Sequence, residues 1–243
     1  MTVNKSVLRL VVQIIFYAIL FLSYLPLTSA VTASIWSEVE GEGFHRNLKY
    51  YVDTGDFKNK SCHIAVFVQL PPSLYVNTDE LADLRRLHKT SSCSDGEIDV
   101  ELFAEKAHYQ NVTICSRLSN TKTVLSIPIH QRYQFATSNG EPSNVTLPRP
   151  KLLIGCRDRL KEHRVSKLKI CWPCVEYSKK WRDLSFKWEG DGNFVWSIPV
   201  GNTSRKFEIT CITLLVTFSG AVYVLWTIYN TCKVPKDRKP KDN

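Results

Sequence analysis

Glycine is scarce in this sequence, and the motifs that depend on it are missing. Only 10 of the 243 residues are glycine, and no glycine-rich phosphate loop occurs. The sequence also has no nucleophile–base spacing, no paired-carboxylate motif and no Asp-rich signature of a glycosyltransferase. We therefore expect no catalytic residues, no cofactor and no bound metal in this chain.

Strands that alternate with long helices are missing as well, which excludes a parallel α/β sheet. There is no internal repeat and no low-complexity stretch. No basic stripe is interleaved with aromatic residues, so the net charge of +9 is no argument for nucleic-acid binding. Part of that charge comes from the two ends of the chain.

A long apolar run near the C-terminus dominates the sequence. Residues 209–229 carry no charged side chain over 21 positions, and a helix of that length spans roughly 30 Å, the thickness of a hydrocarbon core. Tyr223, Trp226 and Tyr229 lie toward one end, as aromatic rings at a membrane interface do. Because the run has no polar face, we predict a single transmembrane helix at 209–229 rather than a buried soluble helix.

The tail after this run, residues 230–243, holds five basic and two acidic side chains. By the positive-inside rule this tail faces the cytosol. Lys239 and Lys241 stand five and three residues from the end. They fit the K-x-K-x-x pattern that retrieves membrane proteins to the endoplasmic reticulum, an address read by a receptor. A generic stop-transfer cluster is the alternative.

The N-terminus has the layout of a signal peptide. Lys5 and Arg9 precede an apolar stretch, and small residues up to Ala30 follow it. We predict cleavage after Ala30 or Ala33, with a retained signal anchor as the alternative. The expected chain is a single-pass type I membrane protein, with signal peptide 1–30, lumenal domain 31–208, transmembrane helix 209–229 and cytosolic tail 230–243.

Six cysteines lie in the predicted lumenal domain, and an oxidising compartment favours three disulfides among them. They are Cys62, Cys93, Cys115, Cys156, Cys171 and Cys174. The sequence leaves their pairing open. Four N-x-S/T sequons predict glycosylation and agree with lumenal exposure. They are Asn59, Asn111, Asn144 and Asn202.

Short segments of alternating apolar and polar residues predict strands. The candidate strands are 64–70, 98–105, 124–135, 144–147, 151–156, 167–172, 184–188 and 194–200. Residues 64–70 are apolar on nearly both faces, which indicates a central strand. Residues 31–57 show little pattern, and we expect an extended lead-in there.

One helix is expected at 79–88. Asn77 can cap it, Glu80 follows three residues later, and Leu81, Leu84 and Leu87 form one apolar stripe. Seven or so short strands with one helix predict a mainly β fold: an antiparallel β-sandwich-like lumenal domain with one short helix, followed by a single transmembrane α-helix.

Cys171 and Cys174 form a C-x-x-C motif, which is typical of thiol–disulfide exchangers when the first cysteine begins a helix in a βαβ unit. A predicted strand precedes this motif, so we interpret it as a structural pair, bonded locally or to other cysteines. A zinc site completed by Cys156 and His163 is disfavoured against disulfides.

His130 and Arg132 lie on the polar face of a predicted strand. They could meet an anionic lipid head group or a partner carboxylate, although a solvated face is the simpler interpretation. The acidic run at 95–101 alternates with apolar residues, as a half-exposed strand does.

Small residues on one face of the predicted transmembrane helix allow a second helix to approach closely. This helix-packing face consists of Thr213, Thr217, Gly220 and Ala221. Leu74, Tyr75 and Trp196 are candidates for contact with a partner, with core packing as the alternative.

Several short sequence motifs occur in a characteristic order. Residues 70–81 read L-P-P-S-L-Y-V-N-T-D-E-L and 127–133 read I-P-I-H-Q-R-Y. Residues 150–156 read P-K-L-L-I-G-C, C-W follows at 171–172, and 198–201 read I-P-V-G directly before the span. With the signal–lumen–anchor layout, this order resembles the phosphatidylinositol-glycan biosynthesis class X (PIG-X / Pbn1) family from about residue 50 to the end of the span.

The resemblance implies a non-catalytic, stabilising subunit of the endoplasmic-reticulum enzyme glycosylphosphatidylinositol (GPI) mannosyltransferase I. In that family the partner is a multi-span catalytic subunit (PIG-M), which transfers the first mannose from dolichol-phosphate mannose to the GPI precursor. The resemblance carries over this role and no catalytic residue. The alternative function is an endoplasmic-reticulum cargo receptor or a cell-surface adhesion protein, and a thiol exchanger is a third.

Overall fold

The structure is a computed structural model that describes residues 33–55, 57, 59, 61–158, 160–190 and 194–233, together with Gln13 and Tyr17. Apart from these last two residues, the expected signal peptide lies outside the described residues. The tail from residue 234 onward, with Lys239 and Lys241, lies outside them too.

The described chain is mostly β-structure. Its strands are β1 (Ala33–Glu40), β2 (His45–Asp53), β3 (Cys62–Leu70), β4 (Leu74–Tyr75), β5 (Ser91–Gly96), β6 (Gln110–Arg117), β7 (Lys122–Gln131), β8 (Ser143–Thr146), β9 (Lys151–Cys156), β10 (Arg182–Asp183), β11 (Phe186–Trp188) and β12 (Val195–Ile198). Its helices are α2 (Thr78–Arg86), α3 (Cys174–Tyr177), the 3-10 turn η1 (Thr203–Arg205) and α4 (Lys206–Lys233).

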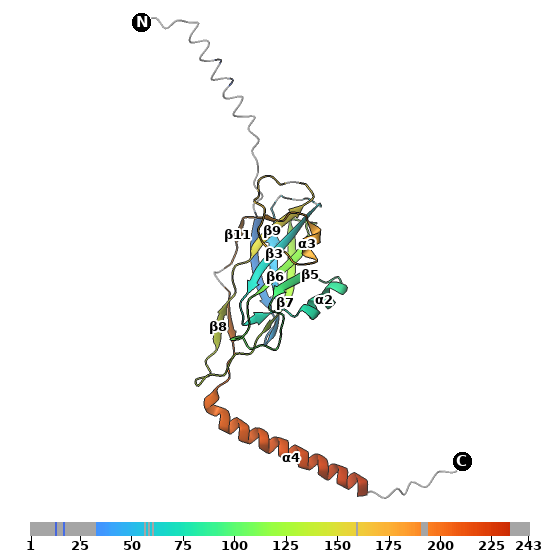
Figure 1. Cartoon of the computed structure of the whole chain (residues 1–243), viewed down its shortest axis with the longest axis vertical. Helices are drawn as coiled ribbons and strands as arrows, with labels where there is room; N and C mark the ends of the chain where they lie inside the picture. The colour runs from blue at the N-terminus through green and yellow to red at the C-terminus, as the bar shows by residue number, and fades with distance from the viewer. Residues whose placement is uncertain are drawn as a thin grey trace, which may run out of the picture.

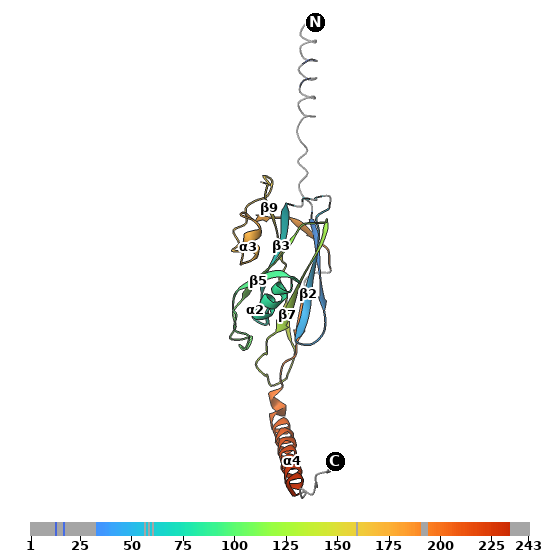
Figure 2. The same ribbon diagram turned by 90° about the vertical axis from the view of Figure 1, so that its right-hand side faces the viewer.

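Two five-stranded sheets form the body of the domain. One has the order β11-β1-β2-β7-β4 and the other β10-β9-β3-β6-β5, while β12 and β8 make a separate ribbon. Among the described strands, the pairings are antiparallel except that of β1 with β11 at a sheet edge. The view in Figure 2 separates the layer of β2 and β7 from the layer of β3 and β9. The predicted antiparallel sandwich with one short helix and a C-terminal apolar helix is confirmed (Figure 1).

One apolar core lies between the two sheets. Leu48, Tyr50 and Val52 alternate inward along β2, and they share a cluster with Ile64 and Val66 of β3. Burying a side chain of this size stabilises the fold by about 1.5–3 kcal/mol. Burial also raises the pKa of Tyr50, so its phenol stays protonated.

Strand β3 is buried on its second face as well, as its apolar pattern predicts. Residues 167–181, which we call the strap, cross the outside of this sheet. They form a second small core with Ala65 of β3 and Leu153 of β9. The strap passes so close to β9 that a Cβ atom at Gly155 would lie 2.5 Å from Cβ of Ser178. Only glycine fits there without a shift of the strap.

The expected lead-in at 31–57 is wrong, because β1 and β2 occupy most of it and pair along seven residues from Ser34 to Glu40. The burial of Leu48, Tyr50 and Val52 shows the period of two that marks a strand. Tyr51 between them and the exposed Trp36 on β1 put aromatic residues on the outward side, and this makes the pattern weak when the segment is examined alone.

The strand expected at 98–105 is also wrong. This segment belongs to the loop between β5 and β6, where Glu97 accepts from the Asp99 amide at 3.0 Å and Asp99 accepts from the Glu101 amide at 2.9 Å. Such local bonds from acidic side chains compete with strand pairing.

Other strand boundaries differ from the prediction in smaller ways. Strands β5 and β6 were not expected, β7 ends at Gln131 rather than at Phe135, and residues 167–172 are extended without strand pairing. The predicted helix is confirmed as α2. Its N-cap is Asn77, whose Oδ1 accepts from the Asp79 amide at 2.9 Å and from the Glu80 amide at 3.4 Å.

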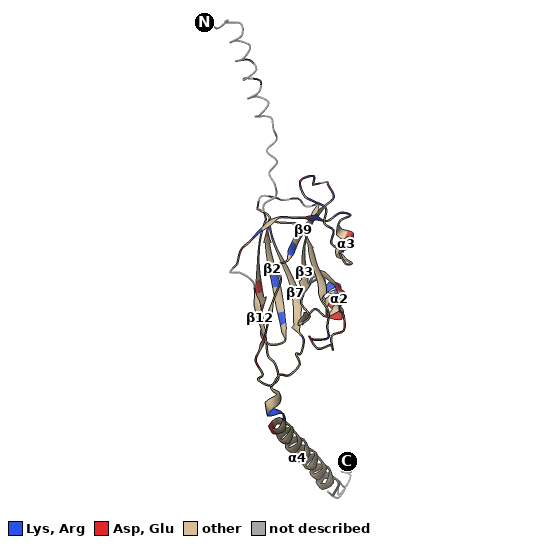
Figure 3. Cartoon of the chain, turned by 60° about the vertical axis from the view of Figure 1, so that its left-hand side comes forward, with Lys and Arg blue, Asp and Glu red and all other residues tan. Residues whose placement is uncertain are grey.

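The C-terminal helix α4 extends away from the β domain (Figure 1). It is long and apolar enough to cross a membrane, and the span that meets this criterion is Thr203–Cys232. In Figure 3 the blue and red segments of the α4 ribbon, which mark charged residues, lie at its first turn. These features fit a single-pass membrane protein.

Trp196 offers a test of this packing, because its indole on β12 is fully buried between the ribbon and the main core. We expect Trp196→Ala to lower the free energy of unfolding by about 3–5 kcal/mol. The neighbouring Val195 is exposed, and Val195→Ala should change it by no more than about 0.5 kcal/mol. Urea unfolding of the detergent-purified chain measures both, and equal losses would contradict the assigned orientation of β12.

Candidate functional site

The end of the β domain that joins α4 is held by main-chain hydrogen bonds. Thr137 lies in the loop between β7 and β8. Its carbonyl accepts a hydrogen bond from the Thr203 amide at 2.8 Å, and its own amide donates one to the Gly201 carbonyl at 2.9 Å. Asn202 caps η1 by accepting from the Ser204 amide at 2.9 Å. We call this part of the domain the α4 end. Any partner that packs along α4 meets it first.

Exposed aromatic side chains gather at the α4 end. Phe44, Phe103, Tyr133 and Phe135 are between 37 and 69 % exposed. The rings of Phe44 and Tyr133 are 5.1 Å apart, and those of Phe103 and Phe135 are 5.0 Å apart. We call these four residues the aromatic edge. Exposed aromatic groups of this kind are typical of interaction surfaces.

The aromatic edge comes from three loops that hydrogen bonds tie together. Gln131 donates its amide to the Phe44 carbonyl at 2.9 Å, and Ala104 donates to the Tyr133 carbonyl at 2.9 Å. The Phe135 amide donates to Oε1 of Glu105 at 2.7 Å. The β1–β2 hairpin, the β5–β6 loop and the β7–β8 loop therefore form one surface rather than three separate tips.

Arg132 supports this surface from inside. Its side chain is buried, donates to the carbonyls of Asp99 and Leu102, and lies over the Tyr75 ring with Cζ 4.6 Å from the centroid. Burial lowers the pKa of Arg132, and the carboxylate of Glu97 opposes the shift. The expectation of a solvated face is wrong for Arg132, because β7 has ended and its side chain turns under the β5–β6 loop.

His130 meets a carboxylate of its own chain. Its Nε2 lies 2.7 Å from Oε2 of Glu80 in α2, and Nε2 of His45 lies 3.5 Å from Oε1 of the same carboxylate. The two imidazole rings are 4.4 Å apart. The carboxylate that the sequence suggested for His130 is therefore supplied by the α2 first turn.

The other residues considered for partner contact are mostly core residues. Leu74 and Trp196 are buried, and Arg46 lies over the Trp196 ring at 4.8 Å. Tyr75 is partly buried between Arg132 and His130. These three side chains therefore position the α4 end without forming its surface.

The predicted helix-packing face is exposed along α4. Thr213 and Thr217 each donate a hydroxyl to the carbonyl four residues earlier, at 2.8 Å. A Cβ atom at Gly220 would meet no atom within 4 Å. The face, completed by Ala221, thus presents small side chains whose polar groups are internally satisfied, as close helix contact in a membrane requires.

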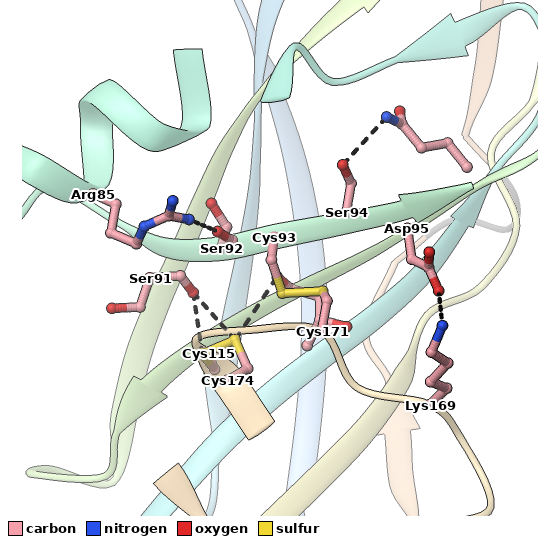
Figure 4. Close-up of a disulfide and its surroundings, with 12 residues drawn as sticks. Arg85, Ser91, Ser92, Cys93, Ser94, Asp95, Cys115, Lys169, Cys171 and Cys174 are labelled. Carbon is pink, nitrogen blue, oxygen red and sulfur yellow. Dashed lines mark hydrogen bonds and ion pairs between the residues drawn. A yellow bond between two sulfur atoms is a disulfide. The ribbon is translucent and has the colours of Figure 1, made fainter. Parts of the chain in front are cut away.

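The six cysteines of the β domain pair in three disulfides: Cys62–Cys156, Cys93–Cys171 and Cys115–Cys174. The C-x-x-C motif therefore bonds to two neighbouring strands, β5 and β6, and fastens the strap to them (Figure 4). This agrees with a structural pair. Because Cys156 is bonded to Cys62, its sulfur is not available as a zinc ligand, and the zinc site considered with His163 is excluded.

The four sequons differ in their surroundings. Asn144 is exposed on β8, whereas Asn59 and Asn111 are partly buried and their side-chain oxygens accept hydrogen bonds from Ser61 and Gln69. Asn202 uses Nδ2, the atom that a glycan would occupy, to donate to the Asn139 carbonyl at 3.2 Å. A glycan on Asn202 would leave Nδ2 one hydrogen for this contact, and its first sugar would have to fit beside Asn139.

The far end of the domain carries a basic cleft of about 830 Å³. Its lining includes His63, Arg117, Arg157 and Tyr177, and the His63 and Tyr177 rings stack at 4.9 Å. Burial and the nearby Arg117 lower the pKa of His63. Because the cleft lies at the end opposite to α4, it is remote from anything embedded in the membrane with α4.

The match to known proteins covers the domain and the span together. The family model described as PIG-X / PBN1 matches residues 41–229. The chain belongs to the PIG-X / PBN1 family. Its curated relatives include two proteins named "GPI alpha-1,4-mannosyltransferase I, stabilizing subunit". The one from Homo sapiens is 26% identical over 79% of this chain and 78% of its own length. The one from Mus musculus is 24% identical over 77% and 78%.

The aromatic edge of this PIG-X / PBN1 chain was missed from the sequence. Tyr133 and Phe135 fell within the strand predicted at 124–135, and Phe103 within the predicted strand that is a loop in the structure. The available signal was the density of aromatic residues near polar turns. It becomes informative only when the three loops are known to meet.

The disulfide pattern of this family member is testable by peptide mapping under non-reducing conditions. We expect the peptide that contains Cys171 and Cys174 to stay joined to those of Cys93 and Cys115. Cys115→Ala/Cys174→Ala should lower the free energy of unfolding by about 2–4 kcal/mol. Cys211 and Cys232 are free, so their replacement by alanine is the matched control. Release of the C-x-x-C peptide alone would contradict the pairing.

Proposed function

We propose that this chain is a non-catalytic, stabilising subunit of the endoplasmic-reticulum GPI mannosyltransferase I, needed for transfer of the first mannose from dolichol-phosphate mannose. The observation that carries the proposal is the family match, which spans the β domain and α4. The shared name of the relatives supports the same role. The partner would be the multi-span catalytic subunit, a PIG-M-like protein.

The proposed placement is the endoplasmic-reticulum membrane, with the β domain in the lumen and the tail in the cytosol. Three disulfides support an oxidising compartment. The basic residues after α4 support a cytosolic tail. Lys239 and Lys241 would then serve as the retrieval signal.

The proposed mechanism is stabilisation by mass action. A subunit that binds the folded partner and not its unfolded form raises the stability of the partner, by about 2.7 kcal/mol at a free concentration of 100 times Kd. Because a difference of this size changes the unfolded fraction many-fold, the abundance of the partner depends on the subunit. No chemistry by this chain is needed.

The α4 end is the proposed contact surface for the catalytic subunit. The aromatic edge is connected through Thr137 to residues that stand just before α4, and in this proposal the partner contacts both the edge and the face of Thr213 and Thr217. Aromatic side chains dominate the binding energy of many protein interfaces. The helix and the edge would thus act as one continuous interface.

Deletion and rescue in cells test this function. Loss of the chain should reduce the level of the catalytic subunit and of GPI-anchored proteins at the cell surface, and the wild-type chain should restore both. A catalytic subunit of normal abundance in the deleted cells would refute the stabilising role.

Rescue variants test the contact surface. Tyr133→Glu/Phe135→Glu should weaken co-purification of the catalytic subunit at least about tenfold, because two hot-spot contacts of about 1–2 kcal/mol would be lost. Val124→Glu, at an exposed position near the other end of the β7 segment, is the control and should retain the partner. If both variants bind equally well, the edge is not the interface. If the edge rests on lipid instead, vesicle binding will fall while partner binding is kept.

The tail is tested by Lys239→Ser/Lys241→Ser in the full-length chain. We expect the variant to leave the endoplasmic reticulum, as seen by maturation of its glycans and by surface labelling. Lys236→Ser is the control for loss of charge alone. Surface expression of the wild-type chain would favour an adhesion protein.

A further inference from the structure

Three potential metal ligands converge beside the α4 end. They are Nε2 of His45, Nε2 of His130 and the carboxylate of Glu80, and their ligand atoms all lie within 4.8 Å of one another. They come from β2, β7 and α2 respectively. We call these residues the His–Glu cluster. No sequence spacing reveals it, because the three positions are 35 and 50 residues apart.

The scaffold beneath the cluster is well defined. His45 and His130 are direct partners in the antiparallel pairing of β2 with β7, so their side chains leave the sheet on the same face about 5 Å apart. Glu80 is fixed by the Asn77 cap of α2. Two bonds between Gln110 and the backbone of Val76, at 2.8 and 3.1 Å, hold the entry to this helix.

The donors suit one class of metal ion. Two neutral imidazoles and a carboxylate are a known ligand set for zinc, with bonds of about 2.0–2.2 Å and a fourth position left for water. Calcium and magnesium prefer oxygen donors and would gain little from two imidazoles. The ionised carboxylate gives the set a charge of minus one, which favours a dication.

We propose that His45, Glu80 and His130 bind one zinc ion, with water as the fourth ligand. Tetrahedral coordination places ligand atoms roughly 3.3 Å apart, so the widest pair, which lies within 4.8 Å, must close by up to about 1.5 Å. His45 is the most exposed of the three, with 55% of its side chain accessible, and it can supply this movement. The stacking of Tyr75 on His130, with centroids 5.0 Å apart, keeps the second imidazole oriented.

Bound zinc would join the first turn of α2 to the ends of β2 and β7 that lie near the α4 end. Its role would be structural, since a ligand that binds only the folded state stabilises that state. The site does not depend on the proposed function. A chain that binds zinc and no catalytic subunit would leave this inference intact, and the reverse result would leave the proposed function intact.

The test uses the full-length chain in detergent, stripped of metal by a chelator and then titrated with zinc. We expect one zinc per chain by atomic emission. At 100 times Kd, Tm should rise by roughly 5–10 °C. His45→Ala retains the contact between His130 and Glu80, so it should fold, and it should bind zinc at least about tenfold more weakly. Magnesium should give no shift.

The matched control is His88→Ala, which removes an exposed histidine at the other end of α2 and should leave zinc binding unchanged. X-ray absorption should show nitrogen and oxygen scatterers only. Sulfur scattering would place the ion on Cys211 or Cys232 and overturn the site. Equal zinc content and equal Tm shift in the wild-type chain and in His45→Ala/His130→Ala would overturn it as well.

Discussion

The inward face of β2 packs on the inward face of β3. This contact fixes the two sheets against each other and so positions the loops at both ends of the β domain. Leu48, Tyr50 and Val52 meet Ile64 and Val66 in one core. A slip of one residue in either strand would turn these side chains to solvent. The register therefore also sets which loops reach the α4 end, and with them the aromatic edge and the His–Glu cluster.

Local patterns predicted the local features well. The apolar character of β3 on both faces, the Asn77 cap of α2 and the uncharged length of α4 are each encoded within about 20 consecutive residues. They were confirmed because few alternative structures satisfy them. The resemblance to the PIG-X / Pbn1 family, based on the order of short sequence motifs, was likewise confirmed by the family match.

Features that depend on distant partners could not be predicted. β1 pairs along seven residues with the neighbouring β2, but both segments carry only a weak alternation, and the second partner of β1, β11, lies about 150 residues later. Asp99 and Glu101 looked like the exposed side of a strand, but their main-chain amides donate to the carboxylates of Glu97 and Asp99, and these local bonds keep the segment in a loop. Six cysteines permit 15 pairings. The β3–β9 register places Cys62 opposite Cys156, and the passage of the strap over β5 and β6 selects the other two pairs.

The hydrogen bonds between Thr137 and residues 201–203 leave almost no flexible spacer between the β domain and the apolar helix α4. The last strand, with Trp196 in the core, precedes α4 by only a few residues. During synthesis from the N-terminus, this strand is therefore one of the last parts of the β domain to be made. A nascent chain stalled before residue 195 would lack the Trp196 side chain and would expose an incomplete core to chaperones.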